Sequence, residues 1–454
     1  METTVETIWT KSKVLVKGLI IGVMVLLLLI PTFYVSSLIE EREQRQNEAI
    51  AEVSSKWAGR QVITGPVIVL PYWQTENATP EKRVRVKKFS YFLPDDLNIT
   101  ASLTPQEKYR GIYKVMLYNS KINLTGSFRQ IDPLKLGIPG EDIIWNEAYV
   151  KLNITDVKGL NEELKMNLGD SALVLSPQSA EDDLSSSGLT ANLPVVSIEQ
   201  LNKLQFSSSL DLNGSEQLLF TPVGRSTSVA LSSPWPHPSF SGDILPNNSQ
   251  VGDTGFSATW KSFAHKRAFP QQWKGNNYSI GHINTGNLNR YVEVAPAKND
   301  LSASSFGANL YVPVNNYQKT TRSIKYAVLC ILLTFAAFFL IETTNNKSVH
   351  PFQYGLIGLA LILFYTLLLS FSEYISFNLS YAIAAVCTIG LITWFVKGIL
   401  SSARLSAVLS SVLVLLYIYI FTILQLQDYS LLFGSIGLFI ALAVIMYFSR
   451  KLQW

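Results

Sequence analysis

The chain has 454 residues, of which 48% are hydrophobic and only 15% are charged, and its formal net charge at pH 7 is +4. This small charge argues against a nucleic-acid partner. Both cysteines, Cys330 and Cys387, fall in long apolar runs, so no disulfide is expected in the polar part of the chain. The apolar runs lie at the N-terminus and in the last third, the pattern of a membrane protein.

The first apolar run extends from Val14 to Leu38 and is long enough to cross a ~30 Å hydrocarbon core. It is too long for the apolar region of a signal peptide, and no small-x-small cleavage site stands immediately after it. We therefore expect residues 1–38 to form a cytoplasmic N-terminus and a retained transmembrane helix.

Residues 39–59 predict a helix that continues beyond the membrane. The segment Ile39–Trp57 is rich in Glu, Gln, Arg and Ala, and two acid–base pairs stand at i,i+4 with the acid first: Glu41 with Arg45, and Glu52 with Lys56. Gly59 suits a helix end. Two interpretations stay open, a solvated stalk or a rigid coupler between the membrane and the next domain.

Residues 60–321 alternate short apolar–polar stretches with Gly, Pro, Asn and Asp, which is typical of an antiparallel β-rich domain. Predicted strands are Val62–Tyr72, Arg83–Phe92, Asn98–Leu103, Tyr109–Leu117, Lys121–Phe128, Ile144–Ile154, Leu204–Leu212, Glu216–Thr221, Ser226–Leu231, Gly255–Phe263 and Gly307–Val314. The stretch Leu231–Asp253 is rich in Pro and Gly and cannot form a central strand. The stretches Ser176–Leu189 and Pro270–Asp300 are expected to be surface loops, and a division into two lobes near residues 180–200 is left open.

Residues 322–454 carry five further apolar runs of about 18 residues or more. These runs are Ile324–Ile341, Phe352–Phe371, Leu379–Val396, Leu405–Leu424 and Leu431–Phe448. The fold class is therefore a membrane α+β protein with six transmembrane helices, one before and five after the β-rich domain. The pairs Gly355/Gly358 and Gly434/Gly437 would let helices approach closely.

Lys and Arg in the short connections predict the orientation. The connection 342–351 carries Lys347, the connection 397–404 carries Lys397 and Arg404, and the tail carries Arg450 and Lys451, whereas 372–378 and 426–430 carry neither residue type. Both termini are thus expected in the cytoplasm, and the β-rich domain on the outside.

Long strings resemble one known family. They are "LIEEREQRQNEAIAEVSSKWAGRQVITGPVIVLPY" (38–72), "SSPWPHPSFSGDILP" (232–246), "GFSATWK" (255–261), "RSIKYAVLCILLTFAAFFLIE" (322–342), "HPFQYGLIGLALILFYTLLLSFSEYISF" (350–377) and "LQLQDYSLLFGS" (425–435). Together they resemble the CreD family of bacterial inner-membrane proteins, nearly end to end. The resemblance implies a multi-pass inner-membrane protein with a periplasmic domain, which supports cell envelope integrity and is linked to the envelope stress response. It supplies no catalytic residue and no mechanism.

One loop of the β-rich domain is a candidate interaction site. It contains Trp235, His237, Phe240 and Asp243, with prolines on both sides of the histidine. His237 could act as a general base if a carboxylate oriented it, and the loop could bind a ligand, but packing of Trp235 and Phe240 on the domain explains the pattern more simply. Metal-ligand spacings are missing from the sequence, so neither a metal nor a cofactor is expected.

The string Gly169-Asp170-Ser171-Ala172-Leu173 is similar to the first block of one esterase class, but the later Asp-x-x-His block is missing. A turn between strands explains it better. Since no Gly-x-Ser-x-Gly elbow or Walker loop is present either, we do not expect an enzyme.

The predicted membrane helices hold their charges at the ends rather than near the midplane, which argues against an ion-coupled transporter. Two of these charges, Glu373 and Asp428, stand in the short outer connections. They are expected to meet basic residues near the membrane surface and so to form domain–membrane contacts; the basic candidates are Arg42, Arg45 and Arg322.

Two functions follow from this reading. The first is a non-catalytic envelope protein whose β-rich domain binds a periplasmic protein, lipid or wall component. The alternative is a component for the handling or export of a lipid or other amphiphile. A solid helix bundle would favour the first, and a groove lined by apolar residues would favour the second. Membrane lipids are expected partners in both cases.

Overall fold

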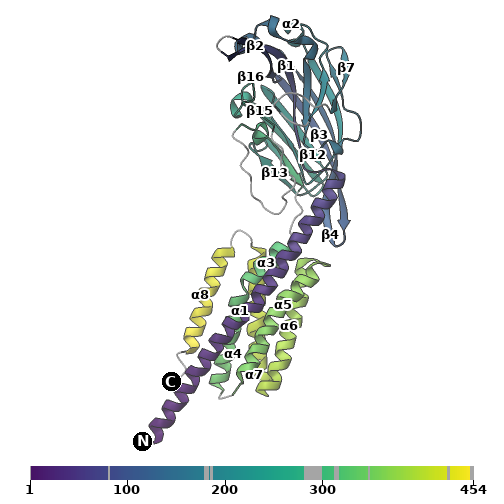
Figure 1. Ribbon diagram of the computed structural model, residues 1–454. Helices are drawn as coiled ribbons and strands as arrows, with labels where there is room; N and C mark the ends of the chain where they lie inside the picture. The colour runs from purple at the N-terminus through teal and green to yellow at the C-terminus, as the bar shows by residue number, and fades with distance from the viewer. Residues whose placement is uncertain are drawn as a thin grey trace. The chain divides into compact units, whose positions relative to one another are not determined.

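The computed structural model describes residues 2–79, 82–177, 184, 188–280, 299–310, 316–345, 348–426 and 430–449. It forms two compact units, which we call the helical unit (Met1–Arg45 and Val314–Trp454) and the β unit (Gln46–Pro313) (Figure 1). The predicted class is confirmed, because a β-rich region lies in the chain between one N-terminal helix and a series of apolar helices.

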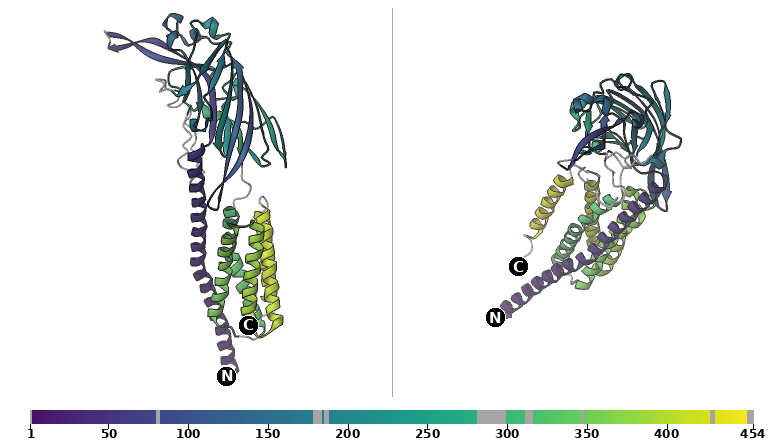
Figure 2. Two further views of the ribbon diagram at one scale, coloured as in Figure 1. Left: turned by 90° about the vertical axis from the view of Figure 1, so that its right-hand side faces the viewer. Right: turned by 45° about the horizontal axis from the view of Figure 1, so that its top comes forward.

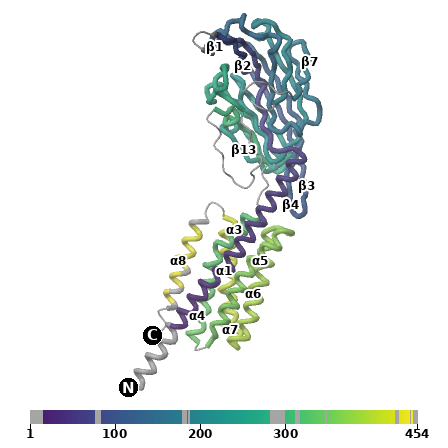
Figure 3. Tube along the Cα trace, in the orientation of Figure 1, coloured from purple at the N-terminus to yellow at the C-terminus, as the bar shows by residue number. Residues whose placement is uncertain are grey.

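The helical unit contains the first part of α1 and six later helices. Their bounds are α1 (Glu2–Trp57), α3 (Asn316–Lys325), α4 (Ala327–Thr344), α5 (Pro351–Ser372), α6 (Phe377–Leu400), α7 (Ala403–Gln425) and α8 (Ser430–Ser449) (Figure 3). Among the described residues α1 and α4 to α7 are long and apolar enough to cross a membrane, and α8 is apolar through Leu432–Val444. The six predicted apolar runs are thus confirmed as helices.

Glycines allow close helix contacts within this unit. A Cβ on Gly358 of α5 would lie 2.1 Å from Leu28 Cδ1 of α1, and one on Gly437 of α8 would lie 1.8 Å from the Tyr419 hydroxyl of α7. With a Cβ at either glycine, the neighbouring Leu28 or Tyr419 side chain could not keep its place, so the glycines make room for these contacts. The predicted close approach is confirmed at these two positions.

Helix α3 was not predicted. It precedes α4, is separated from it at Tyr326, and packs against α5 and α7 through a face that includes Tyr317 and Thr320. Its amphipathic composition hid it from a search for apolar runs, and sequence reasoning left most of it in the β-rich region.

The β unit contains two sheets. Sheet A has nine strands: β1 (Gln61–Thr79), β2 (Lys82–Phe92), β5 (Tyr149–Ile154), β8 (Ser176–Pro177), β9 (Leu189–Asn192), β11 (Gln217–Phe220), β13 (Pro238–Gly242), β16 (Gln272–Lys274) and β17 (Phe306–Leu310). Its order is β13-β17-β11-β1-β5-β9-β8, and β2 joins β1 to β16. The first half of β1 is therefore the centre of this sheet.

Sheet B has eight strands: β3 (Asp96–Arg110), β4 (Tyr113–Ser127), β6 (Lys165–Leu168), β7 (Ser171–Val174), β10 (Gln205–Ser215), β12 (Ser226–Ser233), β14 (Asn248–Gly252) and β15 (Gly255–Phe263). Its order is β14-β15-β12-β3-β4-β10-β6-β7. Both sheets are mainly antiparallel, but the β1–β11 and β3–β12 pairs are parallel. A short helix, α2 (Ile198–Leu201), precedes β10.

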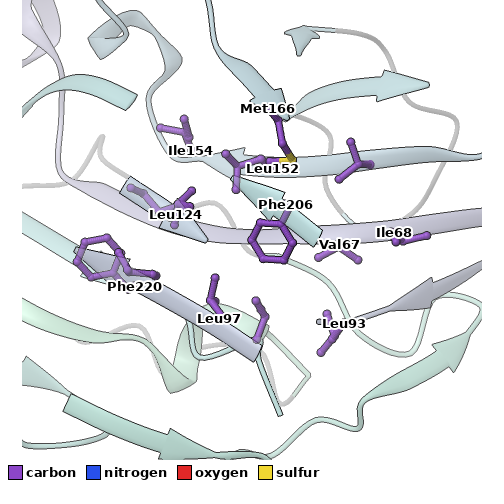
Figure 4. Packing of buried hydrophobic residues seen from close by; sticks show 14 of the residues in the cluster. Val67, Ile68, Leu93, Leu97, Leu124, Leu152, Ile154, Met166, Phe206 and Phe220 are labelled. Atoms are coloured by element: carbon purple, nitrogen blue, oxygen red, sulfur yellow. The ribbon is translucent and has the colours of Figure 1, made fainter. Parts of the chain in front are cut away.

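One apolar core lies between the sheets. Strand β3 alternates buried and exposed residues, so Leu97 and its i+2 neighbours face this core, where they meet Phe206 of β10. Sheet A contributes residues such as Val67 and Phe220 (Figure 4). The strands of each sheet come from both sides of residues 180–200 in the chain, so no break in either sheet coincides with that segment.

The far parts of β1 and β2 form a two-stranded arm, which Figure 2 shows projecting from the rest of the β unit. Trp73 of the arm is 39% exposed, and the Arg85 guanidinium lies 5.7 Å from its ring centroid. Cation–π contact of this kind orders an exposed aromatic side chain.

Several strand predictions are wrong in their bounds. The predicted strand Tyr109–Leu117 runs across a turn, because β3 continues to Arg110 and Gly111 reverses the chain at φ +60° before β4 begins. The prediction that Leu231–Asp253 forms no central strand is confirmed for residues 234–253, where β13 and β14 lie at sheet edges, but it is wrong for residues 231–233, which end the central strand β12. Gly169 has φ +57° in the turn between β6 and β7, so the turn predicted there is also confirmed. Most of the predicted loop Ser176–Leu189, and 281–298 of the second loop, lie outside the described residues.

Candidate functional site

Among the described residues of the helical unit, the most buried acidic side chain is Glu342, in the last turn of α4, with 3% of its surface exposed. One carboxylate oxygen accepts a hydrogen bond from the Val349 backbone N–H at 2.8 Å, and the other accepts one from the Tyr354 hydroxyl at 2.7 Å. Lys17 of α1 completes the group with an ion pair. We call these four residues the Glu342 cluster.

Each contact of the Glu342 cluster has a physical reason. A buried carboxylate is unfavourable unless it is paired and hydrogen-bonded, and the C-terminal end of a helix dipole repels it further. The chain returns from α4 into α5 through His350, whose backbone N–H and Nδ1 form a capping box with Gln353 and the α5 N-terminus. This tight return places Val349 and Tyr354 on the carboxylate, so α1, α4 and α5 meet at one charge.

Sequence reasoning noted Glu342 only as a charge at the end of an apolar run. Its partner Lys17 lies 325 positions away, so no local pattern joins them. The local pattern that marks this site is an acidic residue at the end of an apolar run, followed by a His-Pro helix start.

At the other end of α5, Glu373 forms a second polar group. The Arg42 guanidinium lies 3.7 Å from Glu373 Oε1, and the Tyr317 hydroxyl donates to the same oxygen at 3.3 Å. Asn316 Nδ2 donates to the Ser372 carbonyl at 2.7 Å. Residues of α1, α3 and α5 are therefore joined here, and we call Arg42, Tyr317 and Glu373 the Glu373 cluster.

The five predicted domain–membrane residues have different surroundings. Arg42 and Glu373 are paired, whereas Arg45 pairs with Glu41 on its own helix at 2.6 Å. Arg322 is exposed on α3. Asp428 lies outside the described residues. That this set connects the membrane part to the β domain stays a prediction.

The centre of the helical unit is packed with aromatic rings. The Phe364 ring lies 4.7 Å from Tyr417 and 5.3 Å from Tyr381, centroid to centroid. The Tyr381 hydroxyl donates to the Tyr417 carbonyl at 2.8 Å, which joins α6 to α7. Thr393 and Ser410 join the same two helices with a 2.6 Å hydrogen bond. Mild polar groups thus join α6 to α7 by hydrogen bonds inside the helical unit.

The last part of α1 belongs to the β unit. Glu52 accepts hydrogen bonds from Arg110 Nε and Nη2 at 3.2 and 3.0 Å, and it pairs with Lys56 at 2.7 Å. Just beyond the helix, the Gly59 N–H donates to Asp156 at 3.0 Å. The predicted i,i+4 pairs Glu41–Arg45 and Glu52–Lys56 are both confirmed.

The predicted interaction loop is a loop only in part, because Phe240 lies in the edge strand β13, whereas Trp235 and His237 precede that strand. Trp235 Nε1 donates to the His237 carbonyl at 3.0 Å, and the Phe240 ring packs edge-on against Phe256 and Trp260. His237 and Asp243 are exposed, and among the described residues they share no hydrogen bond. This geometry favours the packed loop over a base oriented by Asp243.

Polar networks lie on the outer face of sheet B. Asp211 Oδ1 accepts hydrogen bonds from the side-chain amides of Asn119 and Asn161, each at 2.5 Å. The Asn161 bond, followed by the Asn119 bond, lowers the pKa of Asp211 below its ordinary value. Asn213 extends the network through a 2.7 Å bond to Asn161.

A buried arginine stabilises the end of sheet A. Arg267 Nη1 donates to the carbonyls of Pro222 and Val223 at 3.2 and 2.7 Å, and its guanidinium lies 4.5 Å from the Phe269 ring centroid. Burial, and then the nearby Arg225, lowers the pKa of Arg267 to about 9.

Within the described residues, His, Cys, Asp and Glu do not group in threes as a metal site requires.

Comparison with known proteins finds one family. Residues 13–454 match the family described as CreD, inner membrane protein CreD. Inner membrane protein CreD of Escherichia coli (strain K12) is 30% identical over 434 residues, which cover 95% of this chain and 91% of that relative. The similarity therefore includes the helical unit and the β unit together.

Proposed function

Because the chain belongs to the CreD family of inner membrane proteins, we propose that it is a non-catalytic protein supporting cell envelope integrity and the response to envelope stress. In this proposal the β unit is a periplasmic interaction domain, and the helical unit is its membrane partner. The interacting component is a periplasmic protein, a lipid or a part of the cell wall.

One observation carries the proposal: α1 is a single helix from Glu2 to Trp57 that contributes residues to both units. In the helical unit it contacts the Glu342 cluster and the Glu373 cluster. In the β unit its Glu52 binds Arg110 through two hydrogen bonds. A continuous helix held at both ends is suited to passing a change in one unit to the other, which favours the coupler over the stalk.

The packed centre of the helical unit supports the envelope role over lipid export. The rings of Phe364, Tyr381 and Tyr417 fill the space between α5, α6 and α7, and each is nearly fully buried. A conduit for an amphiphile needs a lined opening at this place. His237 is exposed, and among the described residues it shares no hydrogen bond with Asp243, which supports a non-catalytic role.

The test compares envelope sensitivity in strains that differ only in α1. A strain without the protein is complemented with the wild type or with a variant carrying Gly-Ser-Gly after Arg45. The matched control carries the same insertion after Asp253, in the exposed turn between β14 and β15. We expect the control to restore resistance to detergents and wall-active agents, and the α1 insertion to fail despite equal membrane levels. Full rescue by both insertions would overturn coupling through α1, and an unaffected deletion strain would overturn the envelope role.

We further propose that both termini are cytoplasmic and that the β unit is periplasmic. The charges Lys397 and Arg404, on either side of the α6–α7 connection, support this orientation. In a Cys387→Ser background, an impermeant maleimide should label Thr254→Cys in intact spheroplasts and Ala403→Cys only after permeabilisation. The reverse pattern would overturn the orientation.

A further inference from the structure

The outer face of sheet B presents rows of small polar side chains. Register places Asn98, Thr125, Ser207 and Asn167 opposite one another across β3, β4, β10 and β6. The next row on β3, β4 and β10 is Thr100, Asn123 and Ser209. Neighbouring strands lie ~4.8 Å apart, so each row offers hydroxyl and amide groups at that interval. The side chains between them along each strand face the core.

The first row opens into a cleft of about 560 Å³ at the end of these strands. Gly126 lies between Thr125 and Ser127, at a position of β4 whose side-chain direction is toward the core. A Cβ there would lie 2.1 Å from the Asp96 carbonyl oxygen and 2.4 Å from the Phe206 ring, so the glycine allows close packing on the core side of the sheet behind the cleft. The cleft is open to the surface, and its lining is more polar than apolar.

The charged groups of the cleft neutralise each other. Arg129 Nη2 lies 2.6 Å from Asp96 Oδ2, and Ser127 Oγ bridges the two by accepting from Arg129 Nε at 3.0 Å and donating to Asp96 at 3.2 Å. The lining therefore carries one acid and one base, a net charge of zero. An anionic ligand such as a phosphate would have to compete with Asp96 for the guanidinium.

The remaining walls consist of hydroxyl and amide groups, chiefly Asn98, Asn167 and Gln205 with Thr125 and Ser207. Each amide donates and accepts, and so can pair with a ligand that does both. The aromatic ring of the lining, Phe206, is 3% exposed and lies under Gly126, so the cleft offers little to an acyl chain.

We propose that this cleft binds an uncharged saccharide, of the class of β-linked sugars that carry acetamido groups. Such a chain presents hydroxyl and amide groups at a repeat close to the strand spacing, without net charge. The inference deepens the proposed function by naming the chemistry of the component that the β unit would contact, and it rests on that function only for the biological source of the sugar.

The first measurement is calorimetry of the full-length protein in nanodiscs, titrated with the β-1,4-linked tetramer of N-acetylglucosamine. We expect the N-acetylglucosamine tetramer to bind saturably at one site and the matched glucose tetramer to bind more weakly. Inorganic phosphate should not change the binding. If the N-acetylglucosamine tetramer does not saturate the protein at millimolar concentration, the proposal is overturned. Displacement of the sugar by phosphate would also overturn it, because the cleft would then be an anion site.

Variants locate the binding. Asn98→Ala and Asn167→Ala should each lower the affinity at least threefold, and the double variant at least tenfold. Asn248→Ala, exposed on β14 of the same sheet but outside the cleft and its rows, is the matched control and should bind as the wild type does. Equal affinity of the wild type and the double variant would place the sugar elsewhere and overturn the assignment.

Sedimentation with insoluble wall material separates a wall glycan from a free oligosaccharide as the source. Cosedimentation that the double variant loses would identify the wall, and tetramer binding without cosedimentation would identify a free sugar; both retain the saccharide site. The proposed envelope function is tested in cells by the α1 insertion, so its failure is distinguishable from failure of sugar binding.

Discussion

The two units use polar side chains in opposite ways. In the helical unit the helices are apolar around most of their surface, so a few polar groups and glycines determine which helices are in contact. The Glu342 cluster joins α1, α4 and α5, and Gly358 of α5 leaves room for Leu28 of α1. In the β unit the alternation of side chains already separates a core face from a water face. The polar side chains on the water face can therefore line the surface and the cleft of sheet B. In the helical unit a buried charge joins three helices, whereas in the β unit, which also holds the buried Arg267, exposed neutral groups line the proposed binding cleft.

The largest expected effect comes from breaking the Glu342 cluster. Glu342→Ala leaves Lys17 and Tyr354 without their acceptor, and loss of one partner of a buried ion pair costs about 3–5 kcal/mol. SDS-induced unfolding in mixed micelles would measure this loss. Glu41→Ala, on an exposed stretch of α1, is the control and should change the unfolding free energy little. A loss below about 1 kcal/mol for Glu342→Ala would contradict the specifying role of the buried charge.

A core change in the β unit should cost less and act differently. Trp260 is 1% exposed and packs against Phe240 and Phe306 at ring distances of 5.7 and 5.8 Å. Trp260→Phe leaves a cavity and should lower the unfolding free energy by roughly 1–3 kcal/mol. Tryptophan fluorescence during urea unfolding would report it. Phe263→Leu, 42% exposed on the same strand, is the control; equal losses for both would show that burial does not decide the effect.

The Asp211 network should give a smaller, acid-dependent effect. Because hydrogen bonds lower the folded-state pKa of Asp211, its contribution is complete above the unfolded pKa of ~3.9 and is lost as pH falls through the folded value. Asp211→Asn should cost about 0.5–1.5 kcal/mol at neutral pH and remove this part of the acid sensitivity. Urea unfolding at neutral pH and near pH 3 measures both. An unchanged dependence on pH would contradict the assignment.

The Glu373 cluster should contribute least. The Arg42–Glu373 distance is 3.7 Å, and although the Glu373 side chain is only 9% exposed, the Arg42 side chain is 37% exposed, so water reaches the pair and weakens it. Arg42→Gln should cost about 0–1 kcal/mol in SDS unfolding. A double-mutant cycle with Glu373→Gln isolates the pair. A coupling energy as large as the Glu342 loss would remove the contrast between buried and exposed charges.

The apolar helices, the β-rich region between them, the i,i+4 pairs of α1 and the turn at Gly169 were predictable from the sequence, because each depends on residues close together in the chain. Helix α3 and the short strands escaped it, since an amphipathic helix lacks an apolar run and strands of four residues carry little pattern. Of the site residues, Arg42 and Glu373, which pair in the structure, were both among the candidate contact residues named from the sequence. No sequence pattern identified Glu342.

Which distant residues meet depends on how the elements pack. Lys17 and Glu342 are 325 positions apart, and the sugar cleft is lined by strands β3, β4, β6 and β10. Burial depends on the neighbours that a fold supplies, and sheet order depends on which strands pair across long loops. Local hydropathy therefore predicts the elements, whereas the buried charge and the cleft exist only once the elements are packed.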